Sequence, residues 1–163
     1  MIRAAAVAAI LLGAVACSST FPTVLLVRHA EKGPGRDPDL TGEGRRRAIA
    51  LVEPAREAGV VAAFHTPYKR SVQTAEPVAE ILGIPLIPVD YAPGKESEHA
   101  DELVRIIQER FAGKTVLVVG HTTTIPEILK KLGVSTVRQI PETEYGTLFV
   151  VVDGGVTESR FGP

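Results

Sequence analysis

Three predicted strands, each with the turn that follows it, carry arginine, histidine and hydroxyl side chains that could together bind and attack a phosphate group. In chain order these side chains are Arg28, His29, Thr66, Arg70 and His121. A planar guanidinium can bond two phosphate oxygens at once, and a neutral imidazole is a nucleophile near pH 7. Attack of a histidine on phosphorus would form a phosphohistidine, which divides one difficult displacement into two easier steps.

Strands and helices alternate along the chain from Thr23 onward, which predicts an α/β fold. Apolar runs predict strands at residues 24–27, 60–64, 84–89 (an edge), 115–119, 147–152 and 156–161 (an edge). Apolar residues at helical spacing predict helices at 42–58 (kinked at Pro54), 67–82 (kinked at Pro77), 101–111 and 126–132. We expect a three-layer sandwich, in which helices cover both faces of a mostly parallel sheet. Ligands bind at the carboxyl ends of such strands, so the polar side chains should meet at one edge.

Length and composition limit the possible functions. The chain has 163 residues, enough for one domain, and a formal net charge of −1, which argues against a general nucleic-acid binder. Its single cysteine excludes an internal disulfide. No cysteine and histidine cluster has zinc-site spacing, so we expect neither a metal nor an organic cofactor. The sequence does not determine an oligomeric state.

The first residues have the pattern of an export signal. Arg3 precedes an unbroken apolar run over residues 4–16, which is shorter than the ~20 residues that span a bilayer. We expect a signal peptide at 1–16, cleaved before Cys17, a tether at 17–22 and the domain at 23–163. The segment is similar to a bacterial lipobox, although Ala14 replaces the usual leucine, so Cys17 should carry lipid and anchor an exported protein in the cell envelope, facing the periplasm or exterior. In the alternative, Cys17 merely follows an ordinary cleavage site.

Four motifs in order resemble those of the histidine phosphatase superfamily, which has the phosphoglycerate mutase-like fold. They are VRHAEK, the Asp39-Leu40-Thr41 and Gly44 stretch, HTPYKRSVQTAEPVAEILGIP, and VLVVGHTTT. Two small replacements occur, with Ala30 for the commoner glycine and Thr66 for the commoner serine. The resemblance implies that the nucleophile is His29 and that the other phosphate-binding groups are Arg28, Arg70, His121 and the hydroxyl of Thr66.

One role in that family, the acid that protonates the leaving oxygen, has several candidates. One branch has a glutamate after the third strand, and the other has an aspartate directly after the second histidine, where this chain has Thr122. Asp90, at the end of the third predicted strand, is the favoured candidate. The alternatives are a glutamate on the following loop (Glu96 or Glu98), Glu31, or no acid at all.

Two further histidines are not expected to take part in the reaction. His65 should be structural or part of the pocket wall, and His99 should be exposed in a glutamate-rich loop. The segment 138–145 carries no functional signal.

Together these features predict a phosphomonoesterase that acts through a phosphohistidine on His29. Its substrate would be a phosphorylated small molecule or a phosphoprotein, including phosphohistidine. The alternative is a cell-envelope module that binds phosphorylated ligands with little or no turnover, which the lack of an obvious acid favours. The stretches 83–101 and 133–145 are too short for a helical lid, which favours hydrolysis over the mutase reaction.

Overall fold

The computed structural model describes residues 20–163, so the predicted signal peptide and Cys17 lie outside the described residues. Six strands form one sheet in the order β3-β2-β4-β1-β5-β6. Their bounds are β1 Thr23–Arg28, β2 Val60–His65, β3 Leu86–Pro88, β4 Thr115–Gly120, β5 Thr147–Val152 and β6 Gly155–Arg160. Neighbours among β1 to β4 are parallel, whereas β5 is antiparallel to both β1 and β6. The predicted α/β fold with a mostly parallel sheet is confirmed.

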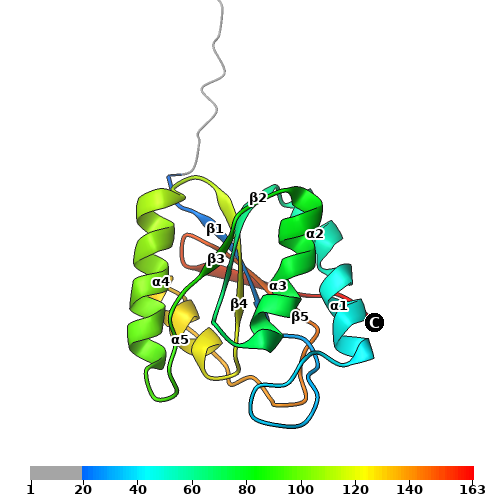
Figure 1. The fold of residues 1–163 in the computed structure, drawn as a ribbon. Helices are drawn as coiled ribbons and strands as arrows, with labels where there is room; N and C mark the ends of the chain where they lie inside the picture. Colours follow the sequence, from blue (N-terminus) through cyan, green and yellow to red (C-terminus); the bar gives the residue numbers. More distant parts are fainter. Residues whose placement is uncertain (1–19) are drawn as a thin grey trace, which may run out of the picture.

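Helices cover both faces of this sheet (Figure 1). Their bounds are α1 Gly42–Ala50, α2 Val52–Glu57, α3 Lys69–Leu82, α4 Glu96–Arg110 and α5 Thr124–Lys131. Figure 1 shows α1, α2 and α3 on one face, and α4 and α5 on the other. Within residues 20–163, no helix has the length and apolar character that crossing a bilayer requires.

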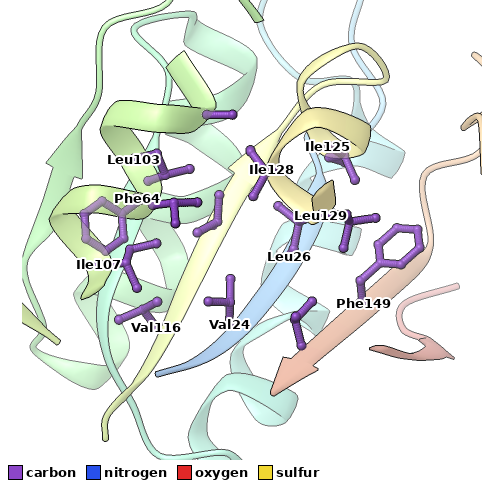
Figure 2. Close-up of a cluster of buried hydrophobic side chains, with 14 of the residues drawn as sticks. Val24, Leu26, Phe64, Leu103, Ile107, Val116, Ile125, Ile128, Leu129 and Phe149 are labelled. Carbon is purple, nitrogen blue, oxygen red and sulfur yellow. The ribbon is translucent and has the colours of Figure 1, made fainter. Parts of the chain in front are cut away.

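The middle of strand β1, residues 24–27, is apolar because both faces of the strand are buried. Val24 and Leu26 pack in the cluster under α4 and α5, which Figure 2 shows around Leu103 and Ile128. Leu25 and Val27, which point to the other side, belong to the cluster with α2 and α3. Burial on two faces leaves the strand little freedom, so the residues at its end are held in fixed positions.

Two helices differ from the sequence prediction. The predicted helix at 42–58 is divided at Leu51, and Pro54 lies in the first turn of α2, where its missing N–H leaves no bond unmade. The predicted helix at 101–111 begins earlier, at Glu96, because glutamates in a first turn interact favourably with the helix dipole. His99 is therefore a buried residue of α4, and the prediction that it is exposed is wrong.

Both predicted edge strands are confirmed. β3 pairs only with β2, and β6 pairs only with β5.

Pro77 lies inside α3 without ending it. The predicted kink near Pro77 does not divide the helix, which continues to Leu82 and ends at Gly83 in a left-handed conformation.

Candidate active site

The ends of β1 and β4 bring two histidine rings together. Arg28 pairs with Gly120 in the parallel register, and the backbone N–H of His29 donates to the carbonyl oxygen of Gly120 at 3.0 Å. The imidazole rings of His29 and His121 consequently lie with their centroids 5.3 Å apart. Both side chains are buried, with 3% and 5% of their surface exposed.

A cavity of about 240 Å³ opens at this edge of the sheet. Four of the predicted site residues line it, together with a lysine, two tyrosines and a glutamate; these eight are Arg28, His29, Lys32, Tyr68, Arg70, Tyr91, His121 and Glu142. The first turn of α3 supplies Arg70, and this turn is tied to the end of β1 by Thr74. The Thr74 hydroxyl accepts from the Ala30 N–H at 2.9 Å and donates to the Arg70 carbonyl at 2.6 Å.

His29 has the protonation state of a nucleophile. Its Nδ1 lies 2.9 Å from the carbonyl oxygen of Ala30, which can only accept, so Nδ1 carries the proton and Nε2 keeps its lone pair. Burial is the main cause that lowers the pKa of His29 to about 3; the bond to Ala30 opposes this shift, and the positive charges of Arg28 and Arg70 add to it. The ring is therefore neutral at physiological pH, and Nε2 is the atom available for attack.

His121 is held by contacts on both sides of its ring. Its Nε2 lies 2.8 Å from the Thr66 hydroxyl, and that hydroxyl donates its one proton to Ser71 at 2.9 Å. Tyr91 stacks on the imidazole at 5.2 Å between centroids, and Tyr68 meets it edge-on. Burial, with the nearby His29 and Arg70, lowers the pKa of His121 to about 2.

Thr66, predicted to bind phosphate directly, does not line the cavity. The structure places it behind His121, where its hydroxyl orients that ring. Thr66 is buried, and its hydroxyl bonds His121 and Ser71 rather than being presented to the cavity. His65 also stays out of the cavity lining, with its Nδ1 bonded to the Thr66 carbonyl at 2.8 Å.

The two arginines each have a buried donor without a protein partner. Arg28 Nη1 donates to the carbonyl oxygens of Pro141, Glu142 and Glu144 at 2.6–3.2 Å, which anchors the segment before β5. Arg70 packs its guanidinium over the Tyr68 ring at 4.3 Å. Among the described residues, Arg28 Nε and Arg70 Nε are the buried side-chain nitrogen or oxygen atoms that lack a hydrogen bond.

The acid candidates predicted from the sequence all lie outside this cavity. Asp90 is exposed at a neighbouring hollow of about 510 Å³, because β3 is separated from β1 by two strands. Both carboxylate oxygens of Glu31 accept from the Nε of Arg47, at 2.8 and 3.0 Å. Glu96 accepts from the Tyr91 hydroxyl at 3.0 Å, and Glu98 is paired with a lysine. The structure thus does not bring Asp90 together with His29.

Glu142, which the sequence analysis missed, is the one carboxylate among the described side chains that line the cavity. Its Oε2 lies 2.6 Å from Arg28 Nη2, and its Oε1 accepts from the Thr122 hydroxyl at 2.7 Å. It reaches this edge because β5 is antiparallel to β1, so the segment that enters β5 meets the end of β1. The available sequence signal was a glutamate just before a strong strand, but the direction of that strand is not visible in its apolar pattern.

The comparison with protein families supports the resemblance in the motifs. Residues 24–94 match the family described as histidine phosphatase superfamily, branch 1. A probable phosphatase from the fission yeast Schizosaccharomyces pombe is 32% identical over 83 residues, which is 45% of this chain. The match spans 29% of the length of that curated relative.

Solved structures with the same fold include three named proteins. Bacillus stearothermophilus YhfR superposes with a TM-score of 0.62 at 18% identity, over 85% of this chain and 96% of that one. The protein histidine phosphatase SixA, in complex with tungstate, superposes with a TM-score of 0.61 at 19% identity, over 86% of this chain and 96% of that one. A phosphoserine phosphatase from Entamoeba histolytica, in complex with 3-phosphoglyceric acid, superposes with a TM-score of 0.60 at 15% identity, over 87% of this chain and 97% of that one. At these identities the three neighbours show that the fold is shared.

The lowered pKa values of His29 and His121 predict a loss of stability in acid. Between their ordinary value of 6.5 and their folded values near 3 and 2, the unfolded chain binds protons that the folded chain does not. The contribution of each neutral histidine to the free energy of unfolding should therefore be present in full above pH ~6.5. The free energy of unfolding should fall by about 2 kcal/mol per histidine as the pH drops from ~7.5 to ~5. Urea unfolding at the two pH values measures the difference. The double variant His29→Asn, His121→Asn should lose most of this acid sensitivity, and an unchanged pH dependence would contradict the assignment.

Proposed function

We propose that this chain is a phosphomonoesterase that hydrolyses phosphate esters, or phosphohistidine, through a phosphohistidine formed on His29. One observation carries the proposal: two buried guanidinium N–H groups without protein partners, Arg28 Nε and Arg70 Nε, belong to side chains that line the same cavity as His29. An unpaired buried donor costs about 1–3 kcal/mol, which a phosphate oxygen would offset on binding. Arg28 and Arg70 supply positive charge, and His29 supplies a neutral nucleophile.

The proposed reaction has two displacements at phosphorus. In the first, His29 Nε2 attacks, the bond from phosphorus to the leaving group breaks, and the phosphoryl group is transferred to the ring. In the second, water attacks phosphorus, and the bond to Nε2 breaks, which returns a neutral imidazole and inorganic phosphate. The guanidiniums stabilise charge on the phosphoryl oxygens in both steps. A bound phosphate dianion raises the pKa of His121, so that this ring can donate to the phosphoryl group as well.

The relatives support phosphate-transfer chemistry and two substrate classes. The yeast relative is a probable phosphatase, and the structural neighbours include a protein histidine phosphatase and a phosphoserine phosphatase. We propose accordingly that the substrate is either a phosphorylated small molecule or a phosphorylated protein side chain. Glu142 in the cavity weakens the alternative of a binding module, which was favoured by the lack of an acid.

The assay that tests this function supplies three kinds of substrate to the purified domain, residues 20–163. They are 4-nitrophenyl phosphate, a panel of phosphorylated metabolites, and a phosphohistidine protein. Release of inorganic phosphate that depends on His29 supports the proposal. Binding of phosphate without release from any of the three would instead identify a binding module.

The short connections around the site favour hydrolysis over phosphoryl transfer between substrates. Within the described chain, residues 89–95 join β3 to α4, and residues 132–146 join α5 to β5, in both cases without a helix. A mutase must exclude water while its intermediate persists, which requires a closing lid. With 3-phosphoglycerate and catalytic bisphosphoglycerate, phosphate release should therefore exceed formation of 2-phosphoglycerate.

We also propose that the domain is exported and tethered to the membrane by lipid on Cys17. The proposal rests on the apolar run at 4–16 and on the place of the only cysteine directly after it. When the full chain is expressed in a bacterium, it should fractionate with membranes, and Cys17→Ser should move it to the soluble fraction. A soluble, unacylated wild-type product that retains residues 1–16 would contradict the tether.

A further inference from the structure

The carboxylate of Glu142 lines the same cavity as His29 and lies beside one of its two arginines. It contacts Arg28 Nη2, so it adjoins the guanidinium that would hold the phosphoryl group. Its second oxygen is fixed by the Thr122 hydroxyl. Its side chain remains 77% exposed, so it can exchange protons with solvent between turnovers.

We propose that Glu142 is the catalytic acid and base of this site, a role that no candidate from the sequence fills. The proposal rests on the proposed phosphohistidine mechanism. In the first step, the bonding electrons of the broken P–O bond go to the leaving oxygen, which takes its proton from the Glu142 carboxyl group. In the second step, the Glu142 carboxylate takes a proton from the attacking water as the P–N bond breaks. Each cycle thus returns a protonated Glu142 and a neutral His29.

The charges around Glu142 change in the required direction when a phosphate ester binds. The ionisable groups that share the cavity with it are Arg28, His29, Lys32, Tyr68, Arg70, Tyr91 and His121. In the structure, the Thr122 bond and the charge of Arg28 hold the pKa of Glu142 below its ordinary value. A phosphate dianion competes for Arg28 and adds negative charge beside the carboxylate, and both effects raise its pKa. Substrate binding therefore favours the protonated form that the first step consumes.

The test is the dependence of kcat/KM on the leaving group in Glu142→Gln. An alkyl phosphate loses a strongly basic alkoxide and needs the acid, whereas 4-nitrophenyl phosphate loses a stable phenolate and does not. General acid catalysis contributes about 10²–10⁴-fold, so the variant should lose roughly 100-fold or more on the alkyl phosphate. On 4-nitrophenyl phosphate, kcat/KM should stay within about threefold of wild type, because protonation adds little for a good leaving group. Glu142→Ala, measured alongside, should show the same selective loss.

Two control variants isolate the role of this carboxylate. Glu144→Gln alters a carboxylate in the same segment that bonds Arg138 and Thr147 outside the cavity, and it should retain wild-type activity on both substrates. Asp90→Asn tests the candidate from the sequence. Thermal unfolding and inhibition by inorganic phosphate show whether each variant is folded with its pocket intact.

The outcomes separate this proposal from the proposed function. Equal losses on both substrates in a folded Glu142→Gln, no loss on either, or a selective loss in Asp90→Asn instead would overturn the role of Glu142. If a phosphoenzyme on His29 still forms in such a case, the phosphatase mechanism stands and only the acid is misassigned. If wild type forms no phosphohistidine, the proposed function itself fails.

Discussion

Replacing Arg70 with lysine should lower kcat/KM for phosphate esters by about 100-fold, although the substitution keeps the positive charge. Arg70 lines the cavity, and the Nε of its planar guanidinium is buried and has no hydrogen-bond partner. Lysine offers a single ammonium group and cannot bond two phosphate oxygens in parallel. The loss should appear mainly in kcat, since these bonds strengthen as charge is redistributed in the transition state.

Arg45→Lys is the matched control for this prediction. Arg45 is an exposed arginine on α1 whose Nη1 donates to the Leu40 carbonyl, away from the cavity. Its replacement should leave kcat and KM unchanged.

Thermal unfolding should show no loss of stability in Arg70→Lys, because the replacement removes a buried donor, Nε, that has no hydrogen-bond partner in the protein. Wild-type kcat/KM in Arg70→Lys would mean that the guanidinium does not hold the phosphoryl group.

Replacing His29 with asparagine should reduce turnover by about 10⁴-fold or more, because the covalent route is then closed. Binding of inorganic phosphate should persist, since Arg28, Arg70 and His121 still line the cavity. Steady-state assays and calorimetric titration with phosphate measure the two effects separately.

His65→Asn provides the control within the same fold. The two histidines have similar places, since His65 is the last residue of β2 and His29 directly follows β1. In each, Nδ1 bonds the backbone carbonyl oxygen of the next residue in the chain. His65 does not line the cavity, so its replacement should change turnover by no more than a few-fold. Comparable losses in both variants would show that the effect is structural rather than catalytic.

The apolar runs predicted the sheet, and they predicted that four polar side chains meet at one edge of it, for a physical reason. A strand buried on both faces is apolar along its length, so the residues at its end stand out, and parallel strands bring those ends together. Arg28, His29 and His121 were placed in this way, and Arg70 follows from the short turn into α3.

The residues that the sequence misplaced depend on information that such patterns do not contain. Glu142 reaches the site because β5 runs antiparallel to β1, and strand direction leaves no mark in an apolar run. Asp90 follows the edge strand β3 and stays away from the cavity because two strands separate β3 from β1, and the order of strands in a sheet is likewise not visible in an apolar run. His99 was assigned to a loop because the first turn of α4 is rich in glutamate, which favours helix N-termini but lacks an apolar pattern. Thr66 lies at the predicted strand end, but its hydroxyl bonds His121 rather than facing the cavity.

The most direct test of the mechanism is to trap the phosphoenzyme. Wild-type protein is mixed with ³²P-labelled substrate, quenched within milliseconds in alkali, and digested for mapping of the label. We expect about one label per active site at most, on Nε2 of His29, stable in base and labile in acid, and we expect no label in His29→Asn. Label on a serine or threonine, or rapid turnover with no protein-bound label and full activity in His29→Asn, would contradict this mechanism.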